Sequence, residues 1–130
     1  MPLAAILMAS QENGMPTRNE ILDVLRLAED AGVVLSLQFR APSGWGQCVI
    51  DRALLAECIE TGRIAAAAAL GLSDDEYLEW VENDGGIRCM AKTRKGARCR
   101  CFVTGSHYSD ATRWKAANAA GGYCSIHGEA

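Results

Sequence analysis

Four side chains that bind transition metals stand as two pairs in the C-terminal part of the sequence. Cys89 and Cys99 form the first pair, and Cys124 and His127 form the second. Three thiolates and one imidazole are a common ligand set for a closed, tetrahedral zinc site with a structural role. The Cys-x-x-His spacing lets two ligands from one turn reach the same ion. The pattern therefore predicts one structural Zn²⁺ ion held by these four residues.

The ligand set leaves two alternatives open. Cys101 lies two residues after Cys99, and side chains at alternate positions of a strand share a face, so either thiol could bind. His107 could replace His127 in the same way. We favour Cys99 because the apolar pair that follows Cys101 places Cys101 in a hydrophobic segment. A minority interpretation is that all these cysteines are simply buried thiols.

Nine residues separate Cys89 from Cys99, more than the roughly two to four of a typical zinc knuckle. Gly96 suits a turn within residues 92–97, so we expect a β-hairpin to return both cysteines to the ion. Every charged residue in this stretch is basic, which favours contact with nucleic acid or a nucleoprotein. Trp114 and Tyr123 are available for stacking on bases. The predicted nucleic-acid-binding residues are Arg88, Lys92, Arg94, Lys95, Arg98 and Arg100.

Catalysis is not expected at these residues. An open catalytic zinc site keeps one coordination position for water and needs a nearby general base. Four protein ligands are available here, and the carboxylates of this segment are Asp110 and Glu129. Cys124 and His127 could form a nucleophile pair, but no third group is placed to orient them. The sequence therefore predicts a non-enzymatic protein without catalytic residues.

The C-terminal segment also resembles a known kind of module. Cys89 is followed by Thr93, Gly96 and Cys99 in the pattern Thr-x-x-Gly-x-x-Cys, and later by Tyr-Cys-x-x-His at 123–127. This arrangement is similar to a small zinc-binding module of uncharacterised phage and mobile-element proteins, and it covers residues 88–128, about a third of the chain. The long intervening loop and the extra Cys101 depart from that pattern and leave the third ligand open. The resemblance implies zinc and a small accessory protein, and it implies no established chemistry.

Charge divides the chain into two parts. Residues 1–87 carry 14 acidic and 5 basic side chains, a net charge of −9, whereas residues 88–130 carry 2 and 8, a net charge of +6. Such a division indicates two surfaces with different partners, or two lobes that attract each other. The Asn-Asp-Gly-Gly sequence at 83–86 marks the boundary. We expect an N-terminal arm at 1–16, an acidic lobe at 17–86 and a basic zinc-binding module at 87–130.

The acidic lobe mixes helical and extended patterns, which predicts an α+β fold: a small helical lobe with a β-hairpin, followed by the compact zinc-binding module. Thr17 and Glu20 form a capping box before a helix that ends near Gly32. Alternating residues at 33–40 and extended residues at 47–50 predict the hairpin, and a second helix is expected at 51–60. Trp45 lies between two glycines of the turn. We interpret it either as an exposed contact residue or, preferably, as the cap of a small core.

Two short helices that meet at Gly71 resemble a helix-turn-helix hairpin. Ser73 and Glu76 form a second capping box at the start of the latter helix. We do not expect this helix to read DNA, because its acidic side chains would be repelled by phosphates. Its acidic face suits a basic protein surface instead, as in an anti-CRISPR-like inhibitor of a host nucleic-acid-binding defence complex. The predicted partner-binding residues are Asp74, Asp75, Glu76 and Glu79.

Cysteine usage fits a reducing compartment. Cys48 and Cys58 stand alone in apolar surroundings, where a free thiol behaves as a small hydrophobe. The short apolar run at the N-terminus lacks the basic residues of a signal peptide. No segment approaches the roughly 18 apolar residues that cross a membrane. We therefore expect a cytoplasmic protein with no membrane partner, whose partner is nucleic acid or a nucleoprotein, or alternatively a protein.

Overall fold

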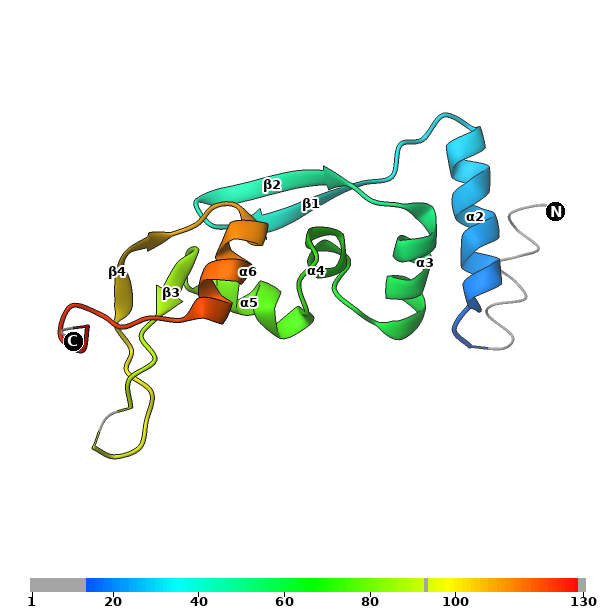
Figure 1. The fold of residues 1–130 in the computed structure, drawn as a ribbon. Coiled ribbons are helices and arrows are strands. Elements are labelled where there is room, and N and C mark those ends of the chain that lie inside the picture. The colour runs from blue at the N-terminus through cyan, green and yellow to red at the C-terminus, as the bar shows by residue number, and fades with distance from the viewer. Residues whose placement is uncertain (1–13, 93, 129–130) are drawn as a thin grey trace. The chain divides into compact units, whose positions relative to one another are not determined.

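A computed structural model describes residues 14–92 and 94–128 of the 130-residue chain. Helices and small antiparallel sheets give the predicted α+β fold (Figure 1). The chain forms two compact units, and each is described by itself. Unit 1 holds the described residues up to Gln38 together with Gln47–Ala69, and unit 2 holds Phe39–Gly46 and the described residues from Leu70 onward.

Helix α2 (Arg18–Asp30) begins at the predicted capping box. The Thr17 hydroxyl accepts a hydrogen bond from the Glu20 backbone N–H, and the Glu20 carboxylate accepts one from the Thr17 N–H at 3.1 Å. The helix ends at Ala31, and Gly32 follows with a φ of 99°. A left-handed residue after a helix favours glycine, so local sequence signals define both ends of α2.

Helix α3 (Arg52–Thr61) packs against α2 within unit 1. Its N-cap is Asp51, as predicted, and Gly62 ends it with a φ of 77°. Ion pairs between the two helices lie at the surface, where such pairs contribute little: Arg18–Glu60 at 2.9 Å and Arg52–Glu29 at 2.8 Å. Helix α4 (Ala65–Leu70) contains the alanine run and follows α3. The buried side chains of unit 1 are small or medium in size: Ile21, Ile50, Ala56, Cys58, Ala66 and Ala67.

Strands β1 (Ser36–Ala41) and β2 (Gly44–Val49) form the predicted hairpin. Its core-facing position is taken by Phe39, whose ring lies over Gly46. A Cβ atom at Gly46 would lie 2.6 Å from that ring, so a larger residue there would displace the ring. Trp45, in the same hairpin, is 76% exposed. The preferred interpretation of Trp45 as the cap of a core is wrong.

Unit 2 is built around two fully buried tryptophans. Helix α5 (Asp74–Glu82) carries Trp80, and helix α6 (Ala111–Ala120) carries Trp114 and packs against α5 and strand β3 (Gly86–Arg88). Both indole N–H groups find carbonyl acceptors, Trp80 on Tyr108 at 2.9 Å and Trp114 on Gly86 at 3.0 Å. Buried indole N–H groups need such partners. We call Leu72, Trp80, Ile87 and Trp114 the tryptophan core.

Strand β3 pairs antiparallel with β4 (Phe102–His107), and the register changes by a bulge between Gly86 and Arg88. The buried Ser106 hydroxyl bridges the two strands: it accepts a hydrogen bond from the Ile87 N–H at 3.0 Å and donates one to the Val103 carbonyl at 2.6 Å. Between β3 and β4 the chain runs outward and back (Figure 1). This excursion carries the first predicted ligand pair.

The turn at 83–86 is packed inside unit 2. Gly85 and Gly86 are buried, and the Tyr108 N–H donates to the Gly85 carbonyl at 2.8 Å. Asp84 accepts a hydrogen bond from the Ser43 N–H at 2.9 Å. By contacts, α5 therefore belongs with the C-terminal segment, whereas separate roles for residues 17–86 and 87–130 stay a prediction. The predicted arm at 1–16 falls largely outside the described residues. Within the part that is described, no helix has the length and apolar character to cross a membrane.

Candidate metal centre

The four predicted ligands lie together in unit 2. One ligand atom from each of Cys89, Cys99, Cys124 and His127 lies within 4.8 Å of all the others. His127 Nδ1 is 3.3 Å from Cys124 Sγ and 3.6 Å from Cys89 Sγ, and Cys99 Sγ is 4.0 Å from Cys124 Sγ. A zinc tetrahedron with bonds of about 2.0–2.3 Å has edges of about 3.5–3.8 Å. The cluster therefore has the size of a four-ligand site and could hold a metal ion.

The predicted hairpin brings the first two cysteines together. Gly96 has a φ of 83° in the turn, a conformation that glycine adopts without strain. The two arms are joined by backbone contacts close to the ligands: Cys89 N–H to Cys101 O at 2.8 Å, Cys99 N–H to Ala91 O at 2.7 Å, and an antiparallel bridge between Lys92 and Arg98. The long spacing between Cys89 and Cys99 is thus closed by strand pairing rather than by a short knuckle.

Two arginines reinforce the base of this hairpin. Arg88 Nε donates to the Cys99 carbonyl at 2.9 Å, and Arg98 Nε donates to the Cys89 carbonyl at 3.0 Å. Their Nη2 atoms reach the carbonyls of Arg98 and Arg88 at 3.3 and 3.1 Å. We call Arg88 and Arg98 the arginine clamp. Because each guanidinium binds the backbone beside a ligand of the opposite arm, the clamp fixes the spacing of the two thiols.

The second ligand pair reaches the centre through close backbone packing. The Met90 N–H donates to the Gly122 carbonyl at 2.9 Å, so the final segment runs beside the first arm of the hairpin. A Cβ atom at Gly122 would lie 2.9 Å from the Val103 side chain. His127 then folds back, with its N–H on the Cys124 carbonyl at 3.1 Å. This turn places the imidazole next to the Cys124 thiol.

Backbone N–H groups point at the sulfurs and favour their ionised form. Burial opposes ionisation of Cys89, but backbone N–H groups, including that of Ala91 at 3.4 Å, hold the pKa of its thiol below the ordinary value. Burial likewise opposes ionisation of Cys124, whose pKa is lowered by the N–H groups of its own turn and by the neighbouring thiols. Cys99 receives an N–H from Cys101 at 3.5 Å, yet burial and the nearby thiols raise its pKa to about 11. A bound cation would replace that proton.

The alternative ligands lie outside the group. The Cys101 thiol is exposed. Its backbone N–H donates to the Cys99 sulfur, and its carbonyl accepts a hydrogen bond from the Cys89 N–H. His107 is also exposed, with Nδ1 3.3 Å from the Asp84 carbonyl. Among the described residues, the metal-competent group contains neither of them. All six cysteines are free thiols.

The predicted nucleic-acid-binding residues divide into two sets. Arg88 and Arg98 are occupied by carbonyls of the hairpin, a role that sequence reasoning missed. A signal was present, because each arginine directly precedes a ligand cysteine. The other four, which we call the hairpin cations, are exposed, and their side chains make no hydrogen bond or ion pair within the described residues: Lys92, Arg94, Lys95 and Arg100. Of the two predicted stacking residues, Trp114 is fully buried, so that prediction is wrong, and Tyr123 is 52% exposed.

The predicted partner-binding acids occupy α5, three of them in its first turn. Glu76 completes the capping box by accepting the Ser73 N–H at 2.8 Å, and it lies 3.6 Å from Lys115. The Ser73 N–H and the Lys115 charge lower the pKa of the Glu76 carboxyl. Asp74 and Glu79 are half-buried, and Asp75 is exposed. Acidic residues at this helix end complement the helix dipole, and their role in binding a partner stays a prediction.

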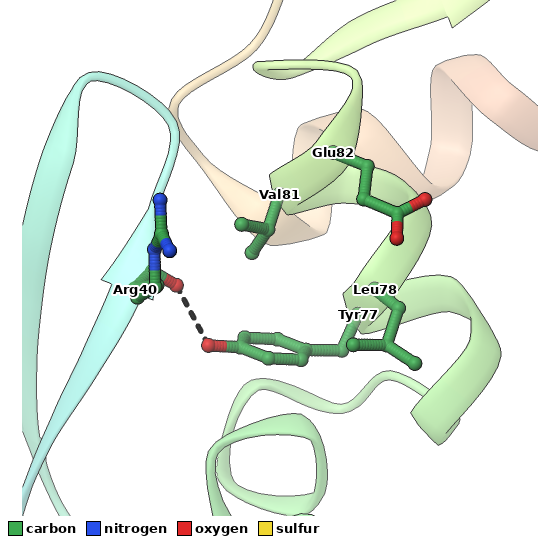
Figure 2. A pocket seen from close by; sticks show the side chains of 5 residues that line it. All are labelled: Arg40, Tyr77, Leu78, Val81 and Glu82. Carbon is green, nitrogen blue, oxygen red and sulfur yellow. Dashed lines mark hydrogen bonds between the residues drawn. The ribbon is translucent and has the colours of Figure 1, made fainter.

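A depression of about 440 Å³ lies beside α5 (Figure 2). Tyr77 lies at its floor and donates its hydroxyl to the Arg40 carbonyl at 2.7 Å. Burial raises the pKa of that hydroxyl. Leu78 and Val81 supply apolar surface, and Glu82 supplies a carboxylate at the rim. This lining brings no nucleophile and base together.

Comparison with known proteins gave no match. No family model, no curated protein and no solved structure matches this chain. The resemblance of residues 88–128 to phage and mobile-element zinc modules therefore stays a prediction, and Thr93 of that pattern lies outside the described residues.

Proposed function

We propose that this chain is a non-enzymatic binding protein in which one structural Zn²⁺ ion folds the C-terminal module, and that the module binds nucleic acid through its hairpin. Three cysteine sulfurs and one imidazole nitrogen match the preference of zinc for tetrahedral sulfur and nitrogen ligands. Four protein ligands fill the coordination shell and leave no position for a reacting water. The metal would therefore support the fold rather than a reaction.

The observation that carries the proposal is the display of the four hairpin cations. They are exposed and unpaired among the described residues, and they lie on a hairpin whose base is held by the arginine clamp and the ligand cysteines. Phosphate binding requires Lys and Arg side chains that no protein carboxylate neutralises, because affinity comes from displacing counterions. The acidic face of α5 is a weaker candidate. Glu76, one of its four acids, is already held by Ser73 and Lys115.

Two measurements test this function. Elemental analysis of the purified chain should find one zinc per chain. The affinity for nucleic acid, measured by fluorescence anisotropy over a range of salt concentrations, should fall steeply with salt. Replacing the four hairpin cations by alanine should reduce the slope of log affinity against log salt by roughly 0.7–0.9 for each phosphate that the variant no longer neutralises.

A matched control is Arg113→Ala. Arg113 is exposed on α6 of the same unit. It carries one positive charge, as each hairpin cation does, but it lies outside the hairpin. Its replacement should leave the salt slope unchanged. Binding that does not depend on salt, or equal slopes for the control and the hairpin variant, would overturn the proposed function.

A further inference from the structure

Three exposed apolar side chains border the metal centre. Met90 follows the ligand Cys89, Tyr123 precedes Cys124, and Ile126 precedes His127. Their exposed fractions are 51%, 52% and 76%, respectively. We call Met90, Tyr123 and Ile126 the apolar rim. Large apolar side chains on a soluble surface commonly mark a contact site when they gather beside one another.

Backbone contacts bring the apolar rim next to the hairpin. The Met90 N–H binds the Gly122 carbonyl at 2.9 Å, which places Met90 beside the residue that precedes Tyr123. Cys99 Sγ and Cys124 Sγ are 4.0 Å apart. Tyr123 is the neighbour of Cys124, and the cation Arg100 is the neighbour of Cys99. An exposed aromatic residue and an exposed cation therefore each adjoin one cysteine of a close pair.

We infer that the ligand of this surface is a single-stranded nucleic acid, with bases stacked on Tyr123 and phosphates bound by the hairpin cations. This inference rests on the proposed function and narrows it to one class of ligand. The Tyr123 ring is half exposed, and its hydroxyl has no hydrogen-bond partner among the described residues. Base faces are free to stack on an aromatic ring only where the strand is unpaired, because a duplex hides them between neighbouring base pairs. Met90 and Ile126 are further exposed apolar side chains beside predicted ligands.

The charge pattern fits this ligand. The hairpin cations supply the electrostatic part of the affinity, and stacking supplies a part that salt does not screen. A channel or groove that binds single strands combines these same two components. Among the tryptophan rings of unit 2, Trp114 and Trp80 are buried in the tryptophan core, and Trp45 is exposed on the separate β1–β2 hairpin.

The test compares single-stranded and duplex probes with the zinc-loaded full chain. The probes are an oligothymidylate of about 20 nucleotides, longer than the roughly 4–16 nucleotides that one binding fold covers, its oligouridylate counterpart, and a DNA duplex of equal length. We expect both single strands to bind more tightly than the duplex. Tyr123→Ala should weaken single-strand binding by about 5- to 150-fold for each base that no longer stacks, without changing the salt slope or the zinc content. Tyr123→Phe should keep the affinity.

The matched control is Trp45→Ala, which removes another exposed aromatic ring of the same unit and should leave binding unchanged. Ile126→Ala is a second, milder change at the apolar rim and should weaken single-strand binding less than Tyr123→Ala. Duplex binding as tight as single-strand binding, or equal effects of Tyr123→Ala and Trp45→Ala, would overturn the inference while the hairpin-dependent salt slope still supported the proposed function. Absence of binding to every probe would overturn both.

Discussion

Within unit 2, the tryptophan core buries large aromatic side chains, whereas the metal centre buries only small thiols. Trp80 and Trp114 fill the first region, and their indole N–H groups are bound by carbonyls. The buried cluster of the second region consists of Cys89, Cys99 and Cys124, with Ala91 packed against it. Burying an aromatic side chain removes roughly 150–250 Å² from water, and three thiols cannot replace that area.

The comparison teaches that one compact unit contains two kinds of stability. The tryptophan core contains no metal-binding side chain, so we expect it to stay folded without a ligand. At the candidate metal centre, thiolates would repel each other once they ionise, and a bound cation would offset that repulsion. The predictions below test whether the two regions can be separated, from the largest expected effect to the smallest.

Removing the metal should have the largest effect. Zinc contributes about 10–16 kcal/mol of apparent binding energy in small zinc-folded peptides. A strong chelator should therefore unfold the hairpin and the final segment and expose the amides of Cys89 and Cys99 to hydrogen exchange. The indole N–H of Trp114 should stay protected. Loss of both regions in one step would show that the comparison is wrong.

Trp114→Ala should instead destabilise the tryptophan core and the metal centre together. Deletion of a buried tryptophan costs about 3–5 kcal/mol, and it leaves the Gly86 carbonyl without its indole donor. Urea unfolding of the zinc-loaded variant should show this loss in the whole of unit 2. Trp45→Ala is the control and should change stability by less than about 0.5 kcal/mol, since Trp45 is exposed.

Serine substitutions should separate the ligand cysteine from its neighbour. Cys99→Ser removes a ligand and should lower zinc affinity by more than the roughly 10- to 100-fold that loss of an outer partner costs. Cys101→Ser keeps the backbone contacts with Cys99 and Cys89 and should leave zinc affinity almost unchanged. Competition with a chromophoric chelator measures both. A larger decrease for Cys101→Ser would exchange the roles of the two cysteines, and equal decreases would contradict the assignment of Cys99 alone.

Arg98→Ala should lower zinc affinity although Arg98 is not a predicted ligand. The side chain holds the carbonyls of Cys89 and Arg88, so its removal should lower zinc affinity by about 10- to 100-fold. Arg94→Ala removes the same charge from the turn and should leave zinc affinity unchanged. For nucleic-acid binding at saturating zinc, we expect Arg94→Ala to change the salt slope more than Arg98→Ala does.

The smallest expected effect is a loss of stability in acid that comes from Glu76 at the start of α5. The pKa of Glu76 is lowered in the folded chain from an ordinary value of 4.5. The charged carboxylate therefore stabilises the fold above that pH, and this contribution is lost as pH falls through the lowered value. Glu76→Gln should remove this part of the acid dependence and cost about 0.5–1 kcal/mol at neutral pH, a capping effect reduced by solvent. Urea unfolding at several pH values, compared with Asp75→Asn, measures it.

Local signals made much of the fold predictable. The capping boxes at Thr17 and Ser73 and the glycine after α3 depend on residues within one turn of each other, and all are present as predicted. The grouping of the four predicted ligands was also predictable, because their residue types and spacing favour one shared site. Their convergence needs only a hairpin and one turn, and both are short-range features.

The remaining features depend on contacts between distant residues. Trp45 and Trp114 have the same intrinsic preference for burial, but Trp45 is exposed on the β1–β2 hairpin, whereas Trp114 is buried with its indole N–H on the Gly86 carbonyl. The grouping of α5 with the tail rests on bonds such as Trp80 to Tyr108, 28 residues apart. The arginine clamp is also invisible to composition, because its partners are carbonyls that every residue possesses.

Because the arginine clamp binds backbone carbonyls, the hairpin can tolerate substitutions in its turn. The arginine clamp donates hydrogen bonds to backbone carbonyls only. Among the described residues of the turn, 94–97, no side chain forms a hydrogen bond or ion pair. Substitutions at 94–97 that keep Gly96 should therefore alter what the turn touches without altering whether it forms. Natural selection, or a combinatorial library, can therefore substitute these turn residues one at a time while the hairpin base held by the arginine clamp stays the same.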